Sequence, residues 1–281
     1  MDAKISLSPA MLLRWYLEAG VDEAILENPV DRYRANATAP EGRVSAQPEA
    51  DEPRRPATRA ERQAAFASTT PAAARADSAT APVESAFAVA QRASSLDELR
   101  TVLAAFEECP LSRTATNLVF GDGCATARIV LIGEAPGAEE DRRGVPFVGP
   151  SGRLLDRMLA SIDLDRTKVF ISNTIFWRPP GNRSPTSSEV ATCMPFVERM
   201  LELIDPDILV ALGGPAACAL LGQADSVGRL RGRWFSFQTP RMARPIATTA
   251  IFHPAYLLRS PAQKRLAWRD LLTIKMKICG H

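Results

Sequence analysis

The chain has 281 residues, of which 46% are hydrophobic and 23% are charged, a composition that indicates a globular protein with one sizeable core. Its 34 basic and 32 acidic residues nearly cancel, so net charge identifies no partner class and any nucleic-acid surface must be local. The five cysteines are scattered, which argues against a disulfide framework and favours a reducing compartment. No apolar run approaches the roughly 20 residues that span a bilayer, and the N-terminus lacks a secretion signal, so we expect a cytoplasmic protein with no membrane partner.

Residues 1–30 are predicted to form an N-terminal helical segment. Ser8 is a candidate helix cap, Pro9 occupies the first helical position, and apolar residues follow at near-helical spacing to Ile25. The apolar face of such a helix needs a surface to pack on. We therefore interpret the segment as a docking element for a partner protein or for the rest of the chain.

Residues 31–83 differ sharply in composition, since they are rich in alanine, proline, arginine, glutamate and serine and contain almost no large apolar side chain. Such a segment cannot bury enough apolar surface to offset its chain entropy, so it is predicted to be a disordered linker. The remaining residues, 84–281, are predicted to form the folded domain.

Strand and helix patterns alternate within this domain. Ser95 and Glu98 have the spacing of a capping box and predict a helix that ends near Cys109. Continuous apolar strands alternating with helices indicate a parallel sheet that is covered on both faces. We therefore predict an α/β fold, a three-layer αβα sandwich around a four-stranded parallel sheet. The predicted strands lie within 127–136, 168–176, 207–214 and 244–256, and the main helices within 151–162, 187–204, 215–222 and 262–278.

Polar motifs follow the first, second and fourth of these strands. They are GEAPG at 133–137, Asn173 with the turn RPPGNR at 178–183, and HPAYLLR at 253–259. Each motif alone has an ordinary explanation as a turn, a cap or a surface residue. Because ligands bind at the carboxyl ends of parallel strands, their joint placement predicts one functional site at that edge of the sheet.

Five stretches in this order resemble the type 4 uracil-DNA glycosylases of the uracil-DNA glycosylase superfamily: GEAPGAEED, GVPFVGPSGRLLDRML, SNTIFWRPPGNRSPT, VALGGPAA and IFHPAYLLR. The resemblance covers about residues 100–275. It implies a uracil-DNA glycosylase-like fold and a monofunctional DNA repair enzyme of the base excision pathway. Such an enzyme hydrolyses the N-glycosidic bond of uracil in single- and double-stranded DNA, leaves an abasic site, and acts at the nucleoid.

The resemblance also assigns roles in the site. The enzyme must extrude the base, whose edge Asn173 would read and whose ring Phe147 would stack on, although an ordinary core role is the alternative for Phe147. His253 would stabilise the departing uracil anion. Glu134 would stabilise the cationic sugar or orient the attacking water. Ala135 occupies a substrate-binding position where the best-known branch of the superfamily has an aspartate, which leaves water activation open.

Local basic and apolar features should hold the DNA. HPAYLLR resembles a loop that enters the minor groove, with Pro254 inside it, Leu257 or Leu258 as the wedge and Arg259 on a phosphate. Further phosphate contacts are predicted for Arg178, Arg183, Arg229, Arg231 and Arg233, with a solvated face as the alternative. Glu140 and Asp141 are interpreted as solvated, with a supporting role next to the site residues as the alternative.

The cysteines depart from the family pattern. Type 4 enzymes typically hold a [4Fe-4S] cluster on four cysteines, but Phe106 and Trp177 occupy two of these positions here, and only Cys109 and Cys193 remain. Two thiolates cannot hold a cluster that needs about four ligands, so we expect no bound cofactor. Our hypothesis is that the two aromatic rings pack against each other and leave the two cysteines as buried thiols.

Two alternatives to a uracil-DNA glycosylase stay open. One is a catalytically weak or inactive protein that binds uracil or DNA. The other is a glycosylase for another deaminated base such as hypoxanthine or xanthine, which Ala135 and a roomier pocket would permit. The joint presence of Glu134, Phe147, Asn173 and His253 favours the enzyme. The sequence favours neither uracil opposite guanine nor uracil opposite adenine.

Overall fold

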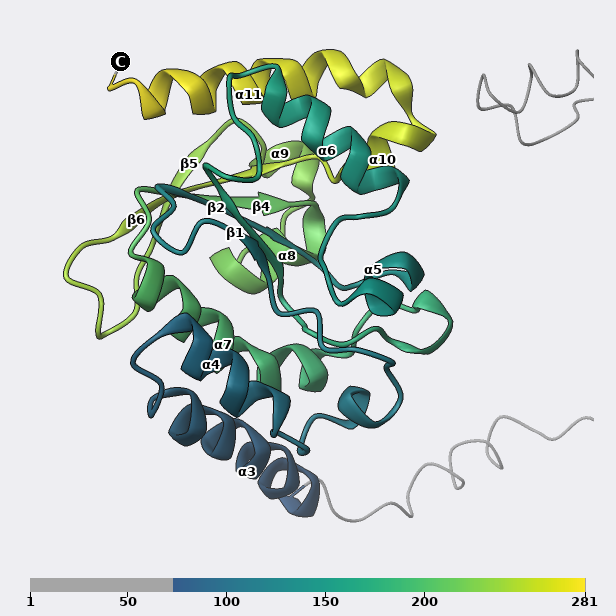
Figure 1. Ribbon diagram of the computed structural model, residues 1–281, viewed down its shortest axis with the longest axis vertical. Helices are drawn as coiled ribbons and strands as arrows, with labels where there is room; N and C mark the ends of the chain where they lie inside the picture. The colour runs from purple at the N-terminus through teal and green to yellow at the C-terminus, as the bar shows by residue number, and fades with distance from the viewer. Residues whose placement is uncertain (1–72, 281) are drawn as a thin grey trace, which may run out of the picture. The chain divides into compact units, whose positions relative to one another are not determined.

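The computed structural model describes residues 73–280 (Figure 1). The predicted N-terminal helix, and the predicted linker up to residue 72, lie outside the described residues. Helix α3 (Ala73–Ala90) is the first described element, so the predicted domain boundary at residue 84 falls inside a helix. No helix in the described part of the chain is long and apolar enough to cross a membrane.

Six strands form one sheet, in the order β1-β3-β2-β4-β6-β5. The four inner strands are β3 (Phe170–Asn173), β2 (Ile129–Gly133), β4 (Ile208–Leu212) and β6 (Ile246–Ile251), and each pairs in parallel with its neighbours. They are almost wholly buried, which explains their continuous apolar sequences. These strands are the four that the sequence predicts.

The two edge strands were not predicted. Strand β1 (Asp122–Gly123) pairs antiparallel with β3, and β5 (Trp234–Phe237) pairs antiparallel with β6. The sheet therefore has six strands rather than four, although the α/β class is confirmed. Both strands are short, and β5 alternates little in burial, so neither carries a clear two-residue period.

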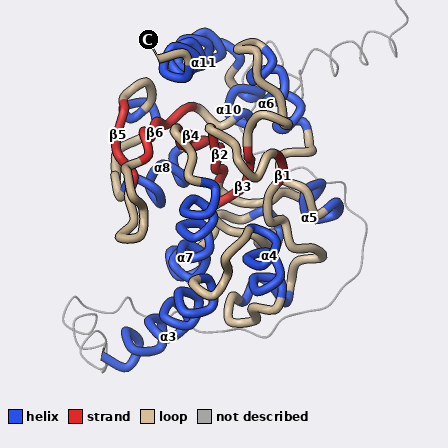
Figure 2. The backbone as a smooth tube through the Cα atoms, turned by 60° about the vertical axis from the view of Figure 1, so that its left-hand side comes forward, coloured by secondary structure: helices blue, strands red, loops and turns tan. Residues whose placement is uncertain are grey.

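Helices cover both faces of the sheet, as Figures 1 and 2 show. Successive strand residues point to opposite faces, so Val130 and Ile132 pack with the core around α7, whereas Ile129 and Leu131 pack with the core around α6 and α11. The predicted three-layer sandwich is thus confirmed. The helices are α4 (Leu96–Ala104), α5 (Ala138–Arg143), α6 (Pro150–Ala160), α7 (Ser187–Ile204), α8 (Gly214–Leu221), α9 (Val227–Leu230), α10 (Pro254–Arg259) and α11 (Lys264–Ile278), with short 3-10 turns at Pro110–Arg113, Pro180–Asn182 and Pro261–Gln263.

Helix capping agrees with the sequence in one place and differs in another. Ser95 caps α4 through its hydroxyl, which accepts a hydrogen bond from the Glu98 N–H (3.2 Å). The Glu98 carboxylate accepts from Ser94 instead of closing the box, and α4 ends at Ala104 rather than near Cys109. Cys109 instead precedes a separate 3-10 turn, because Pro110 begins that turn.

Candidate active site

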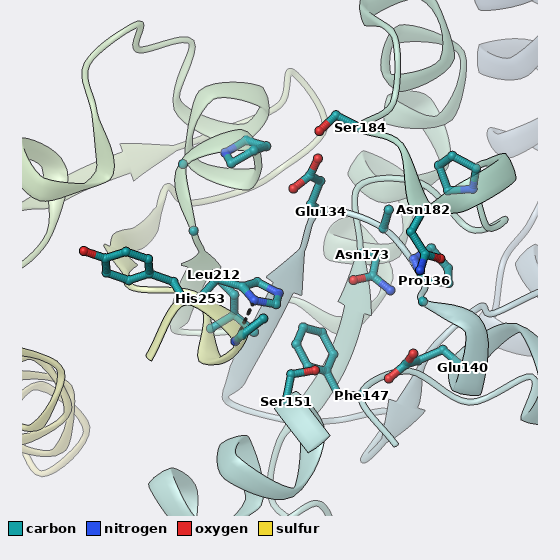
Figure 3. Close-up of a pocket in the computed structure, with 18 of the residues that line it drawn as sticks. Glu134, Pro136, Glu140, Phe147, Ser151, Asn173, Asn182, Ser184, Leu212 and His253 are labelled. Carbon is teal, nitrogen blue, oxygen red and sulfur yellow. Dashed lines mark hydrogen bonds between the residues drawn. The ribbon is translucent and has the colours of Figure 1, made fainter. Parts of the chain in front are cut away.

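A cavity of about 650 Å³ lies at the carboxyl ends of the inner strands (Figure 3). Glu134 follows β2, Asn173 ends β3, Leu212 ends β4 and His253 follows β6, and all four line the cavity together with Phe147. The structure therefore brings together the strand-end residues that the sequence singles out. Parallel pairing explains this, since it aligns the carboxyl ends of neighbouring strands on one edge.

Asn173 offers an unsatisfied polar atom to this cavity. Its side chain is 1% exposed, and its Oδ1 atom has no hydrogen-bond partner among the described residues. Gly133 permits this placement, because a Cβ atom there would lie 2.5 Å from Asn173 Oδ1 and 2.6 Å from Phe147 Cζ. A buried acceptor without a partner is costly, so a ligand that donates a hydrogen bond to Asn173 would complete the site.

Phe147 forms a wall of the cavity and is also part of the core. Its ring is buried, and its centroid lies 5.6 Å from that of the His253 ring. The backbone has a φ of 54°, a left-handed conformation that is uncommon for a bulky residue. Arg166 stabilises this conformation by donating to the Phe147 carbonyl, and it is itself held by Asp122 (2.8 Å) and Asp156 (2.8 Å). Sequence analysis missed Arg166, whose role depends on partners far from it in the chain.

His253 is a neutral hydrogen-bond donor at the cavity. Its Nδ1 atom accepts from the Ala255 N–H (3.1 Å) at the start of α10, so a neutral ring carries its proton on Nε2. Burial, reinforced by the charge of Arg259, lowers the pKa of His253 from 6.5 to about 4, while the Glu140 charge opposes the change. The imidazole is therefore uncharged at neutral pH.

Glu134 and Ala135 lie between β2 and α5 and line the same cavity. The Glu134 carbonyl accepts from the Thr174 hydroxyl (2.7 Å), and the Thr174 N–H donates to the Gly133 carbonyl (2.8 Å). These bonds fix the backbone after β2 against the end of β3. In Figure 3 the Glu134 carboxylate points toward Ser184, which lines the same cavity.

The interpretation of Glu140 and Asp141 as solvated residues is wrong, because both are buried. One Glu140 oxygen accepts from the N–H groups of Val148 (3.0 Å) and Gly149 (3.1 Å) and so holds the segment that carries Phe147. One Asp141 oxygen accepts from the N–H groups of Thr116 (2.8 Å) and the residue after it (3.1 Å). Glu140, which also lines the cavity, and Asp141 thus hold the backbone segments around it.

The predicted minor-groove loop is a helix, α10, rather than a loop. Leu257 is 1% exposed and packs into the core with α6 and α11, which removes it as a wedge in this structure. Leu258 is 42% exposed and stays available for that role. Pro254 is buried at the first position of α10, while Arg259 is exposed and lines the cavity.

Most arginines that were predicted to contact phosphate have partners within the chain. Arg183 forms a two-pronged ion pair with buried Glu189 (2.6 and 2.9 Å). Breaking this pair to reach a phosphate would leave a buried carboxylate without its cation, which is strongly unfavourable. The others are also engaged: Arg178 donates to Asn182 (2.7 Å), Arg231 to buried Asp270 (2.7 and 2.9 Å) and Arg229 to Asp225 (3.4 Å), and Arg233 lies over the Phe235 ring (5.3 Å).

The two cysteines at the family's cluster positions form a buried pair. Their sulfur atoms are 4.0 Å apart, and both side chains are almost fully buried. The hydrogen bond between the thiols, together with burial, raises the pKa of Cys193 well above its ordinary value. Cys109 and Cys193 therefore share one small buried space.

The two aromatic residues fill the rest of this region, but not as the hypothesis states. Phe106 packs edge-on against Phe196 (centroids 5.1 Å apart), and Trp177 packs edge-on against Phe176 (6.4 Å). Both rings are buried in one core cluster, and each has its aromatic contact with a phenylalanine rather than with the other. No group of three or more potential ligands occurs in residues 73–280, so these positions do not fit a four-thiolate cluster.

Comparison with known proteins gives consistent results. Residues 120–272 match the sequence model of the uracil DNA glycosylase superfamily. The chain is 39% identical over 190 residues to a type-4 uracil-DNA glycosylase of Archaeoglobus fulgidus, an alignment that covers 66% of this chain and 94% of that relative. Similar matches are the type-4 uracil-DNA glycosylases of Thermotoga maritima (39% over 166 residues, 58% and 84% covered) and Sulfurisphaera tokodaii (33% over 186 residues, 64% and 84% covered).

Proposed function

Because the chain belongs to the uracil-DNA glycosylase superfamily and to its type-4 branch, we propose that it removes uracil from DNA by hydrolysing the N-glycosidic bond. The product is an abasic site, the substrate of the later steps of base excision repair. The observation that carries the proposal is one cavity that holds a buried amide oxygen without a partner and a neutral imidazole donor.

Asn173 accounts for recognition of the base. Its Oδ1 atom accepts the N3 hydrogen of uracil, and its amide nitrogen donates to O4. Cytosine has no hydrogen on N3 and carries an amino group at position 4, so both interactions would be mismatched. A site that leaves buried polar groups unpaired with the wrong base discriminates strongly against it.

His253 accounts for stabilisation of the leaving group. Breaking the glycosidic bond places negative charge on uracil, and the Nε2–H group donates to its O2 atom. A donor that is already oriented by its Nδ1 bond needs little reorganisation when this charge develops. Since the pKa of His253 is about 4, the imidazole acts as a neutral donor and keeps its proton.

Glu134 accounts for the sugar side of the reaction. Its carboxylate lies in the wall of the cavity, where it stabilises positive charge on the sugar or orients a water molecule. Ala135, next to it, contributes no polar side chain. None of the residues that line the described cavity is a lysine, the residue type that forms Schiff bases, which supports simple hydrolysis without strand cleavage.

The test is a panel of oligonucleotides carrying uracil opposite guanine, opposite adenine or in single strands, and hypoxanthine or xanthine in duplexes. After incubation, alkali cleaves any abasic site. We expect cleavage of the uracil substrates that depends on alkali. Cleavage of only the hypoxanthine or xanthine duplexes would favour the alternative base, and binding without any cleavage would favour the non-catalytic alternative.

We also propose that this domain folds and acts without an iron-sulfur cluster. The support is the donor set, since Phe106 and Trp177 replace two of the four expected ligands. Protein purified anaerobically should contain far less than one iron per chain and should lack a visible thiolate-to-iron absorption band. Stoichiometric iron with that band would contradict the proposal. Action in the cytoplasm, at the nucleoid, stays a prediction that fractionation would test.

A further inference from the structure

One wall of the cavity has little backbone support of its own. Residues 179–184 run through prolines at 179 and 180 and end before Pro185, and proline has no N–H group to donate. The Asn182 and Arg183 N–H groups close the turn by donating to the Pro179 and Pro180 carbonyls (3.1 and 3.4 Å). Asn182 and the glycine before it are both left-handed (φ 55° and 65°). The position of this wall therefore depends on side-chain contacts.

An ion pair supplies such a contact. The Arg183 guanidinium donates to both oxygens of Glu189 (2.6 and 2.9 Å) and also to the carbonyl of Ser184 (3.0 Å). Glu189 is 7% exposed and belongs to the first turn of α7. The Arg183 guanidinium thus connects the backbone at Arg183 and Ser184 to Glu189, in the first turn of the long helix α7.

Helix capping alone does not explain this arrangement. Glu189 already completes a capping box, in which its Oε2 atom accepts from the Thr186 N–H (2.8 Å) and Thr186 Oγ1 accepts from the Glu189 N–H (3.2 Å). Such a box needs no arginine. The fork to Arg183 is an additional interaction: besides neutralising the buried carboxylate, it holds the segment that precedes the helix.

The wall held in this way faces the residues of the proposed reaction. Asn182, Arg183 and Ser184 line the same cavity as Glu134 and Asn173. Figure 3 shows the Glu134 carboxylate pointing toward Ser184. A shift of the wall would change the space left for the extruded nucleotide and for water.

We propose that the Arg183–Glu189 ion pair is a positioning clamp, which sets the distance between the 182–184 wall and Glu134 and thereby orients the sugar of the extruded nucleotide. The inference rests on the proposed uracil release. Arg183 then acts by holding the wall in position rather than by contacting a DNA phosphate. A residue that keeps only the positive charge, such as lysine, would therefore not replace it.

The test compares Glu189→Gln, Arg183→Lys, Arg183→Gln and the Arg183→Gln/Glu189→Gln double variant in single-turnover uracil release and in DNA binding. Misplacement of reacting groups by about 1 Å costs on the order of 10²-fold in rate, so we expect a drop of about tenfold to a hundredfold in each variant. The double variant should be no slower than the singles, because all remove one interaction. The Kd for DNA should change less than about threefold in every variant, since the clamp contacts no phosphate.

The matched control is Asp207→Asn, which breaks an exposed ion pair with Arg128 (2.5 Å) near the beginning of β2 and β4, away from the cavity. It should leave the rate of release unchanged. Rates equal to wild type in Glu189→Gln and Arg183→Lys would overturn the clamp. So would normal release by Arg183→Lys combined with weaker DNA binding and a smaller salt dependence in Arg183→Gln, the pattern of a phosphate contact.

Hydrogen exchange separates failure of the clamp from failure of the proposed function. If the wild-type protein releases no uracil, the proposed function fails. The clamp is then judged by amide exchange at 181–184, which should be at least tenfold faster in Glu189→Gln than in wild type or Asp207→Asn. Equal exchange in all three proteins would overturn the inference regardless of activity.

Discussion

At the scale of single residues, the protonation state of His253 determines what the cavity can do. Burial and the nearby Arg259 charge lower its pKa to about 4, and the Ala255 N–H bond assigns the proton to Nε2. A histidine with the ordinary pKa of 6.5 would gain a second proton in mildly acidic solution. The structure instead keeps a neutral donor over the whole neutral range.

This protonation state predicts a pH dependence. The folded pKa lies below the unfolded one, so the unfolded chain binds the proton first as the pH falls. The stability that His253 contributes is therefore complete above pH 6.5 and is lost between pH 6.5 and 4. We expect the wild-type protein to lose more free energy of unfolding between pH 7.5 and 5 than His253→Asn, which does not titrate but can still cap α10. Equal losses in denaturant titrations would contradict this pKa.

The rest of the site shows which residues the sequence can identify. Glu134, Asn173 and His253 follow strands in recognisable motifs, so their convergence could be predicted from strand order. Arg166 and Glu140 could not, because the backbone groups they hold come from other segments of the chain. Supporting residues of this kind are defined by tertiary contacts rather than by local pattern.

At the scale of elements, the lobe formed by α3, α4 and α7 depends on aromatic packing. Phe106 is 6% exposed and packs on Phe196 of α7, beside the buried cysteine pair. The sequence predicted α7 with its observed bounds, and the structure shows a capping box at its beginning. It overestimated α4 and missed α10 as a helix, since short helices that begin or end near proline carry little periodic signal.

Removal of the Phe106 ring should therefore destabilise the lobe. We expect Phe106→Ala to lower the free energy of unfolding by about 3–5 kcal/mol, the usual cost of deleting a buried aromatic side chain. The matched control is Phe87→Ala on α3, whose ring is 51% exposed, and it should change stability by less than about 0.5 kcal/mol. Urea unfolding measures both, and similar small effects would show that this packing does not support the lobe.

At the scale of the whole domain, the carboxyl ends and the amino ends of the inner strands lie on opposite sides of the sheet and have different roles. The carboxyl ends of the four inner strands carry the cavity and Arg259, whereas Arg244 lies just before β6 at the opposite edge, close to Asp207 (3.0 Å). The parallel core could be predicted because buried strands alternate with helices. The edge strands could not, because their pairing depends on neighbours rather than on their own period.

This separation predicts which charges bind DNA. Arg259→Gln should weaken binding and reduce the slope of log Kd against log salt by about 1, as expected for one lost phosphate contact. Arg244→Gln removes the same charge from the other edge and should leave the slope unchanged. Binding titrations at several salt concentrations measure both values, and equal slopes for the two variants would contradict the assignment of the cavity edge to DNA.

The most direct test of the account is single-turnover release of uracil from a duplex oligonucleotide at pH 7.5, measured for the wild type, Asn173→Ala and His253→Asn, with Asp207→Asn as control. We predict release by the wild type and the control, and a loss of about 10²-fold or more in each site variant, because each removes a contact to the base or to the departing anion. Wild-type release that both site variants retain would contradict the account.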